Sequence, residues 1–128
     1  MNMSEQSIQI LVLDDEEIVG KRLKTALEKS DYDVEVFQDS GEAVERIAEK
    51  EFDIVVTDMR MEGIGGMGIL ERVVEQSPRT KVIVITGYAT VEVAREALTR
   101  GAFDFIAKPF KPDDLRKIIE KAVKELRR

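Results

Sequence analysis

Residues 8–15 of the chain are IQILVLDD, a short aliphatic run that ends in two aspartates. Short runs of apolar and β-branched residues are typical of strands buried on both faces of a parallel sheet. The same pattern recurs at residues 53–57 (DIVVT) and 81–86 (KVIVIT). We therefore expect three central strands, each of which leads into polar residues.

Two weaker strand candidates complete the set. Residues 33–37 (DVEVF) alternate between polar and apolar side chains, as an edge strand does, and residues 103–106 (FDFI) follow a helix stop at Gly101. Between the strands, apolar residues recur at helical spacing. The clearest helix begins near Pro112, a residue suited to a first helical turn, and Asp39 is a candidate cap for the second helix.

This strict alternation of five strands with five helices predicts an α/β fold. Parallel neighbours need a helical, right-handed crossover, so the expected architecture is a three-layer αβα arrangement around an open, five-stranded parallel sheet. A length of 128 residues with 43% hydrophobic side chains suits one domain. We expect that domain to span residues 1–128, with residues 1–7 as a flexible N-terminal tail.

The composition excludes several classes of function. The chain contains no Cys and no His, so thiolate metal sites are excluded and any bound metal must be held by oxygen. The net charge of -6 argues against direct binding of nucleic acid by this domain. No apolar run approaches the roughly 20 residues of a membrane span, and the N-terminal residues are too polar for a signal peptide. We expect a cytoplasmic protein without a membrane partner.

Polar residues gather where the expected strands end. Asp14 and Asp15 follow the first strand, Asp58 the third, Thr86 ends the fourth, and Lys108 follows the fifth. Ligands of open α/β sheets bind at this carboxyl edge. Converging carboxylates repel one another unless a cation binds them, and Mg²⁺ prefers carboxylate, carbonyl and water oxygens. The sequence therefore predicts a Mg²⁺ site.

Phosphoryl transfer suits these residue types, because it needs mainly in-line positioning and neutralisation of charge. Ionised Asp58 can be the nucleophile without a general base, Lys108 can neutralise phosphoryl oxygens, and Thr86 can donate a hydrogen bond to one. Each residue taken singly has an ordinary structural interpretation, as a helix-start acid, a turn residue, a strand residue or a loop residue. Their shared position at one edge of one sheet favours the functional interpretation.

A glycine-rich motif follows the third expected strand. Residues 63–68 (GIGGMG) match the G-x-G-x-x-G pattern of dinucleotide-binding sites. The glycines begin five residues beyond Asp58 instead of directly after the strand, and no acidic residue lies between Gln76 and Val91 to bind a ribose. We therefore expect a mobile glycine-rich loop beside the acidic residues and no nucleotide site.

Four motifs make the chain resemble the receiver domains of response regulators over roughly residues 8–126. They are LVLDDEE at residues 11–17, VVTDMRM at 55–61, VIVITGY at 82–88 and GAFDFIAKPF at 101–110. The resemblance implies a flavodoxin-like sheet with strand order 2-1-3-4-5, for which a chemotaxis receiver is a standard example. It also implies a signalling domain that catalyses its own phosphorylation and dephosphorylation and is not a conventional enzyme.

The resemblance assigns roles in phosphorylation and metal binding. Asp58 would be the phosphoacceptor, and Mg²⁺ would be coordinated by Asp15, Asp58 and the backbone carbonyl of Arg60. Asp14 would act mostly through water. Lys108 would pair with the phosphoryl group, and the Lys108-Pro109 peptide bond is often cis in such domains.

Further roles concern switching and the lifetime of the phosphoryl group. Thr86 would shift on activation, and Phe105 matches an aromatic whose ring rotates into the space that Thr86 leaves. Arg60 and Tyr88 occupy positions that control the access of hydrolytic water. Glu62 departs from the pattern, because many receivers have proline there.

The resemblance also implies partners. The phosphoryl donor would be a sensor histidine kinase or a phosphotransfer protein, and an output domain or target would bind the fourth helix, fifth strand and fifth helix. A homodimer that forms on phosphorylation is left open, as is the choice between a stand-alone regulator and part of a longer protein. Two alternatives remain: a receiver-shaped adaptor that works without phosphorylation, and a Mg²⁺-dependent phosphatase, disfavoured because the first strand lacks a D-x-D pattern.

Overall fold

The computed structural model describes residues 7–60, 63–87 and 91–128, so residues 1–6 of the expected tail lie outside it. Within these residues, five strands alternate with five helices, as expected. In chain order they are β1 (Gln9–Leu13), α1 (Glu17–Glu28), β2 (Asp33–Phe37), α2 (Ser40–Glu49), β3 (Ile54–Asp58), α3 (Gly66–Gln76), β4 (Lys81–Thr86), α4 (Val91–Thr99), β5 (Asp104–Ala107) and α5 (Pro112–Leu126).

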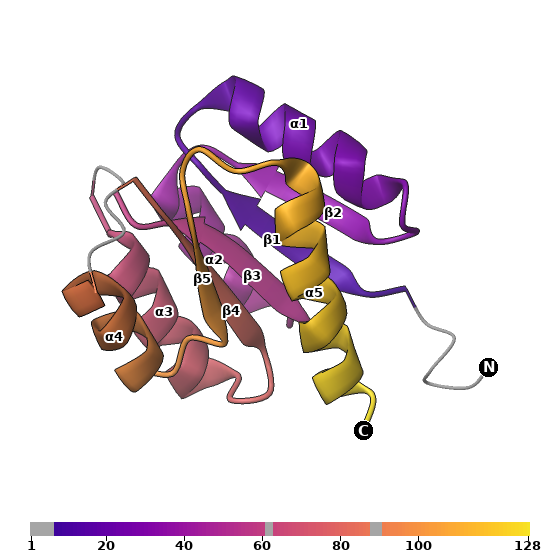
Figure 1. Ribbon diagram of the computed structural model, residues 1–128. Helices are drawn as coiled ribbons and strands as arrows, with labels where there is room; N and C mark the ends of the chain where they lie inside the picture. Colours follow the sequence, from indigo (N-terminus) through magenta and orange to yellow (C-terminus); the bar gives the residue numbers. More distant parts are fainter. Residues whose placement is uncertain (1–6, 61–62, 88–90) are drawn as a thin grey trace.

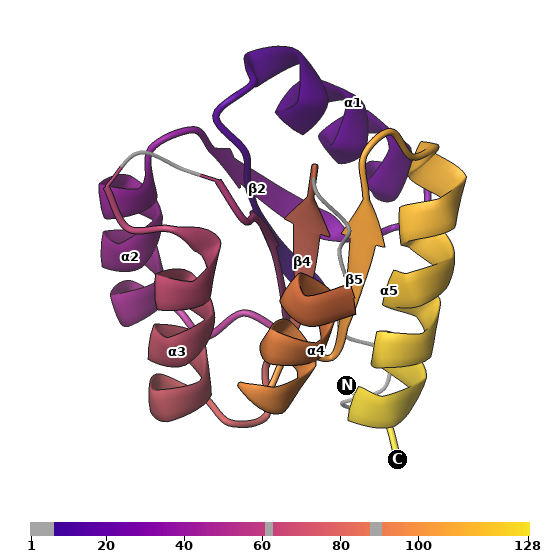
Figure 2. The same ribbon diagram turned by 60° about the vertical axis from the view of Figure 1, so that its left-hand side comes forward.

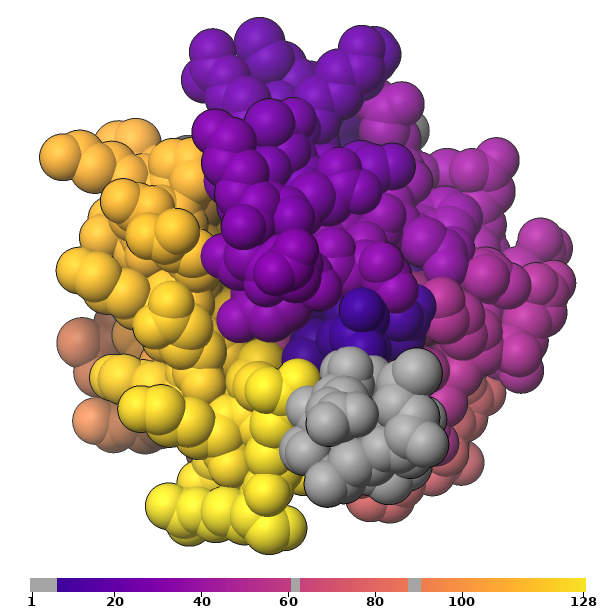
Figure 3. Space-filling view, turned by 90° about the vertical axis from the view of Figure 1, so that its right-hand side faces the viewer, coloured from indigo at the N-terminus to yellow at the C-terminus, as the bar shows by residue number. Residues whose placement is uncertain are grey.

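The strands form one parallel sheet in the order β2-β1-β3-β4-β5, which confirms the expected flavodoxin-like topology. Helices α1 and α5 cover one face of the sheet, and α2, α3 and α4 cover the other (Figures 1 and 2). Figure 3 shows α1, in purple, lying directly beside α5, in yellow. The three layers of the αβα prediction are therefore present.

The central strands are apolar because both of their faces are buried. In β1, Ile10 and Val12 pack into the core beneath α1 and α5, whereas Leu11 and Leu13 pack into the core beneath α2, α3 and α4. Side chains of a strand alternate between faces, so continuous apolar character is required only where both faces are covered. The alternating β2 pairs with β1 alone, which confirms its position at the edge.

The local signals in the sequence mark the ends of several elements. The Asp39 side chain accepts a hydrogen bond from the Glu42 amide at 3.0 Å and so caps α2. Gly101 has a φ of 107°, a left-handed conformation in which glycine avoids the steric cost of a Cβ atom. Pro112 is the first residue of α5. The predicted 103–106 strand is displaced by one residue, because Ala107 still pairs with Thr86.

Among the described residues, no helix is both long enough and apolar enough to span a bilayer.

Candidate functional site

The carboxyl ends of the strands bring the predicted residues to one edge of the sheet. Asp58 is the last residue of β3 and Thr86 the last of β4, while Asp14 directly follows β1. Lys108 directly follows β5, and its amide donates a hydrogen bond to the Thr86 carbonyl at 2.8 Å. The parallel register therefore places four segments that are distant in sequence side by side.

The Lys108 ammonium is the centre of the site. Its Nζ atom lies 3.0 Å from Oδ2 of Asp58, 3.2 Å from Oδ2 of Asp14 and 3.3 Å from Oε1 of Glu16. Burial would lower the pKa of Lys108, but the hydrogen bonds to Asp58 and Asp14 outweigh burial and raise it above the usual value. The side chain therefore stays positively charged at neutral pH.

Asp58 is held at both carboxylate oxygens. Oδ1 accepts a hydrogen bond from the Arg60 amide at 3.0 Å, and Oδ2 accepts one from Lys108. The residue is only 5% exposed, so little of it is open to solvent. These two contacts fix the direction of the oxygen atoms at the tip of β3.

Asp14 is fully buried, and its two oxygens differ. Oδ1 accepts a hydrogen bond from the Glu16 amide at 2.9 Å. Oδ2 is also buried and receives no well-aligned hydrogen bond from the described residues, although it lies close enough to Lys108 for an ion pair. Burial raises the pKa of Asp14, and the Glu16 amide and Lys108 offset only part of that effect. A buried acceptor without an aligned donor suits a water molecule or a cation.

Asp14 belongs to a group of three carboxylates that lie close together. Carboxylate oxygens of Asp14, Asp15 and Glu16 all lie within 4.8 Å of one another. Hard oxygen donors are the ligands that Mg²⁺ prefers, and the chain offers no Cys or His as an alternative. The donor set and the unaligned Oδ2 of Asp14 therefore fit a hard divalent cation.

Glu16 is a member of this group that the sequence analysis did not single out. Its position in the run DDEE suggested only a helix-start acid. In the structure its side chain is 60% exposed and pairs with Lys108, 92 residues away. The available signal was its place directly after the two aspartates, at the same strand end.

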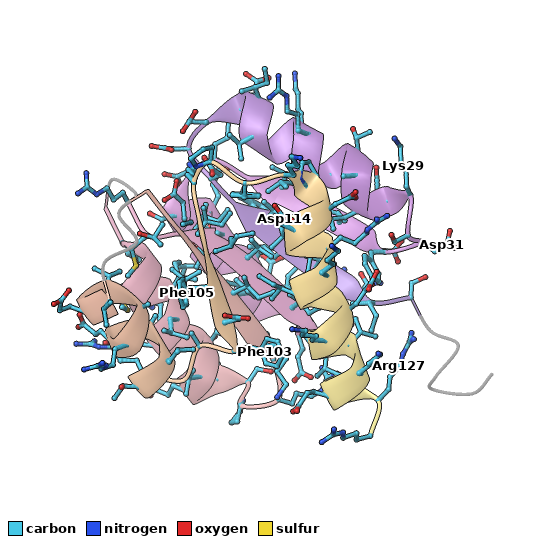
Figure 4. The ribbon with its side chains drawn as sticks, viewed as in Figure 1. Lys29, Asp31, Phe103, Phe105, Asp114 and Arg127 are labelled. Atoms are coloured by element: carbon cyan, nitrogen blue, oxygen red, sulfur yellow. The ribbon has the colours of Figure 1, made fainter. Side chains whose placement is uncertain are left out.

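Of the remaining predicted residues, the structure describes Thr86, Phe105 and Arg60. Thr86 is buried at the end of β4, with its side chain on the face that Val84 shares. Phe105 lies opposite Val84, so it is a diagonal neighbour of Thr86, and it packs against the core under α2, α3 and α4 (Figure 4). The Arg60 side chain is exposed, and Tyr88 and Glu62 lie outside the described residues.

Comparison with known proteins decides the family. The family model named response regulator receiver domain matches residues 10–120 of the chain. The chain belongs to this family. Receiver domains are the signalling modules of two-component systems. The Lys108-Pro109 peptide bond of this receiver domain is cis, as the resemblance led us to expect.

Curated relatives of this receiver domain are regulatory proteins of greater length. It is 35% identical over 121 residues to the transcriptional regulatory protein ZraR of Escherichia coli O157:H7, covering 94% of this chain and 27% of that protein. It is 33% identical over 116 residues to the transcriptional regulatory protein FixJ of Bradyrhizobium diazoefficiens, covering 91% of this chain and 57% of FixJ. The chain thus spans about a quarter of the length of the first of these relatives.

Solved structures show the same fold. A CheY-like receiver domain protein from Methanospirillum hungatei JF-1 is 30% identical and superimposes with a TM-score of 0.90, covering 95% of this chain and 98% of that one. The beryllofluoride-activated receiver domain of NtrC4, a dimer in solution, is 34% identical with a TM-score of 0.87, covering 92% and 98%. The αβα architecture is therefore that of receiver domains.

Proposed function

We propose that this receiver domain accepts a phosphoryl group on Asp58 in a Mg²⁺-dependent reaction, and that the modification switches an output surface. The observation that carries the proposal is the contact of one ammonium, that of Lys108, with both Asp58 and Asp14. This arrangement places a positive charge beside the carboxylate of Asp58 at the carboxyl edge of the sheet. Charge neutralisation and positioning are the main requirements of phosphoryl transfer.

In the proposed reaction, a carboxylate oxygen of Asp58 attacks the phosphorus atom of the donor. The donor is the phosphohistidine of a sensor histidine kinase or of a phosphotransfer protein. As the new O–P bond forms, the N–P bond breaks and the imidazole nitrogen keeps the bonding electron pair. Lys108 can form an ion pair with the oxygens of the transferred phosphoryl group, because its Nζ atom is already in contact with the Asp58 carboxylate. Thr86 would then hydrogen-bond one of these oxygens.

The metal would be held by Asp15, Asp58 and the backbone carbonyl of Arg60, with Asp14 acting through water. When bound, Mg²⁺ would neutralise negative charge on the transferring phosphoryl group and keep it in line. The Glu16 amide orients the carboxylate of Asp14, and the Arg60 amide orients that of Asp58. Attack by water on the phosphorus atom would break the O–P bond to Asp58 and release inorganic phosphate, so the domain would catalyse its own dephosphorylation. Arg60 and Tyr88 would set the lifetime of the phosphoryl group.

The output surface would consist of α4, β5 and α5, with Thr86 and Phe105 as the switch. Two large apolar side chains of α4, Val91 and Leu98, are 66% and 46% exposed, which suits a surface that binds a partner. The partner would be an output domain or target protein in the cytoplasm. Because the related NtrC4 receiver domain is a dimer in its activated form, a second copy of this chain is also a candidate partner.

Incubation with Mg²⁺ and acetyl phosphate, followed by intact-mass measurement, tests the proposal. We expect a single phosphoryl adduct that Asp58→Asn abolishes. The matched control is Asp53→Asn, directly before the other end of β3, where the carboxylate accepts hydrogen bonds from Gln9 and Arg79. This variant should keep the adduct. No adduct on the wild type would favour an adaptor that works without phosphorylation, and continuous hydrolysis without an adduct would favour a phosphatase.

A further inference from the structure

Gly66, the first residue of α3, lies in direct contact with the backbone of the proposed phosphoacceptor. A Cβ atom built on Gly66 would lie 2.6 Å from the carbonyl oxygen of Asp58 and 2.8 Å from Cα of Met59. Both distances are shorter than real Cβ atoms show, and both neighbours are backbone atoms. The Gly66 amide also donates a hydrogen bond to the Met59 carbonyl at 3.1 Å. The start of α3 therefore rests directly on the peptide that follows Asp58.

The backbone conformation of Gly66 does not itself require glycine. Positive φ angles occur at Gly63 and Gly101 among the glycines, whereas Gly66 is helical. Alanine is the better helix former, so an isolated helix would favour it at this position. The reason for glycine at position 66 is steric, since the space that a methyl group would fill is occupied by the Asp58 peptide.

We propose that Gly66 is a positioning residue for the reaction at Asp58, which rests on the proposed function of that carboxylate. Because Gly66 has no side chain, α3 can support the end of β3 at close range, and the Asp58 carboxylate is presented to Lys108 and to the Arg60 amide. A methyl group would push the Asp58 peptide away from α3. The carboxylate oxygens would then leave the line of attack on phosphorus.

The expected effect is kinetic. Small displacements of a reacting group cost large factors in rate, on the order of 100-fold for 1 Å. A shift of a few tenths of an ångström in Gly66→Ala should slow formation of the aspartyl phosphate about tenfold at saturating Mg²⁺. In this assay the carboxylate of Asp58 forms the new O–P bond while the P–O bond of acetyl phosphate breaks and acetate leaves.

Two other glycines provide matched controls. At Gly68, in the same helix, a Cβ atom would lie 2.7 Å from Cγ2 of Ile64, which is a side-chain atom, and it would meet no backbone atom of β3. At Gly101, a Cβ atom would meet Val74 at 3.0 Å, and the φ of 107° is unfavourable for alanine. Gly101→Ala should therefore destabilise the fold without touching β3. It shows what loss of stability alone does to the rate.

The experiment measures the rate of phosphorylation by quenched-flow intact mass, the thermal midpoint and the amide NMR shifts of the wild type and the three alanine variants. We expect a slower rate only in Gly66→Ala, with its largest shift changes at Asp58, Met59 and Arg60. An unchanged rate in Gly66→Ala, an equal slowing in Gly101→Ala, or loss of a cooperative unfolding transition in Gly66→Ala would each overturn the inference. If the wild type itself forms no adduct, the proposed function fails instead.

Discussion

At the scale of a single residue, the buried Asp14 carboxylate lowers the stability of the fold while it supplies oxygen atoms to the site. Its carboxylate is fully buried, and one of its two oxygens has no well-aligned donor among the described residues. Burying a charge that is incompletely paired costs stability. Functional sites commonly keep such groups because the chemistry needs them.

Replacement of this carboxylate should therefore stabilise the metal-free protein. We expect Asp14→Asn to raise the free energy of unfolding by about 1 kcal/mol, or the thermal midpoint by about 4 °C, because asparagine keeps the shape and removes the charge. Thermal unfolding in the presence of EDTA measures this. Asp53→Asn, which loses an ion pair with Arg79, should lower the midpoint under the same conditions. A lower midpoint for Asp14→Asn would show that the Lys108 ion pair outweighs the cost of burial.

Glu35 provides a pH-dependent prediction away from the site. The hydrogen bond from Arg46 is the largest cause that lowers the pKa of Glu35 from 4.5 to about 2; burial opposes it and Lys50 adds to it. A carboxyl with a lowered folded-state pKa stabilises the fold fully above pH 4.5 and loses that contribution as the pH falls toward 2. Since the side chain is 32% exposed, solvent screening limits the contribution to about 1 kcal/mol.

The measurement compares urea unfolding of the wild type and Glu35→Gln from neutral to acidic pH. The wild type should be the more stable at neutral pH, and the difference should shrink as the pH drops below 4.5. A difference that stays constant over this range would show that the Arg46 and Lys50 contacts do not depend on the charge of Glu35.

At the scale of the elements, α1 and β2 approach each other through one glycine. A Cβ atom on Gly20 would lie 2.5 Å from Cγ1 of Val36. Gly20→Ala should therefore destabilise the protein by about 2 kcal/mol, because the added methyl group overpacks this contact. In a Val36→Ala background the same change should cost less than about 1 kcal/mol. Urea unfolding of the wild type, the two single variants and the double variant tests the contact. If the two substitutions changed the free energy of unfolding additively, Val36 would move aside freely.

The elements were predictable because their signals are local. Continuous apolar runs mark β1, β3 and β4, and the alternation in β2 marks an edge strand. The boundaries were less certain, since the end of a strand depends on its neighbours. Asp58 belongs to β3 because it pairs with Ile85, and Ala107 belongs to β5 because it pairs with Thr86. Such pairings are tertiary contacts that local sequence does not specify.

At the scale of the whole molecule, folding gathers carboxylates that the unfolded chain keeps apart. Asp14 and Asp58 contact one ammonium in the structure, and Asp15 and Glu16 lie beside Asp14. A cation that is held by Asp58 together with Asp15 can bind only the folded state and therefore stabilises it. Saturating Mg²⁺ should raise the thermal midpoint of the wild type by about 3 °C, and Asp15→Asn should reduce the rise by about half.

Differential scanning fluorimetry with Mg²⁺, and with K⁺ at matched ionic strength as the control, measures this effect. An equal response to both salts would indicate screening of surface charge and no specific metal site. An undiminished response in Asp15→Asn would place the metal away from Asp15.

The gathering of Asp14, Asp58, Thr86 and Lys108 could be predicted because parallel strands end at the same edge. Two features of the site could not. The contact of Glu16 with Lys108 depends on the turn after β1 and on an exposed side chain, whose direction no local pattern fixes. The contact of Gly66 with the Asp58 peptide depends on how closely α3 packs against β3. The sequence analysis placed this glycine in a mobile glycine-rich loop, whereas in the structure it is the first residue of α3.

The position of the phosphoryl group is the most direct test of the proposed chemistry. Protein treated with acetyl phosphate and Mg²⁺ is reduced with sodium borohydride, which converts an acyl phosphate to an alcohol with release of phosphate but leaves free carboxylates intact. Tandem mass spectrometry of its peptides should find homoserine at position 58 alone among the 26 acidic residues, and none without acetyl phosphate. Conversion at Asp14, Asp15 or Glu16 instead, or at no residue, would contradict phosphorylation of Asp58.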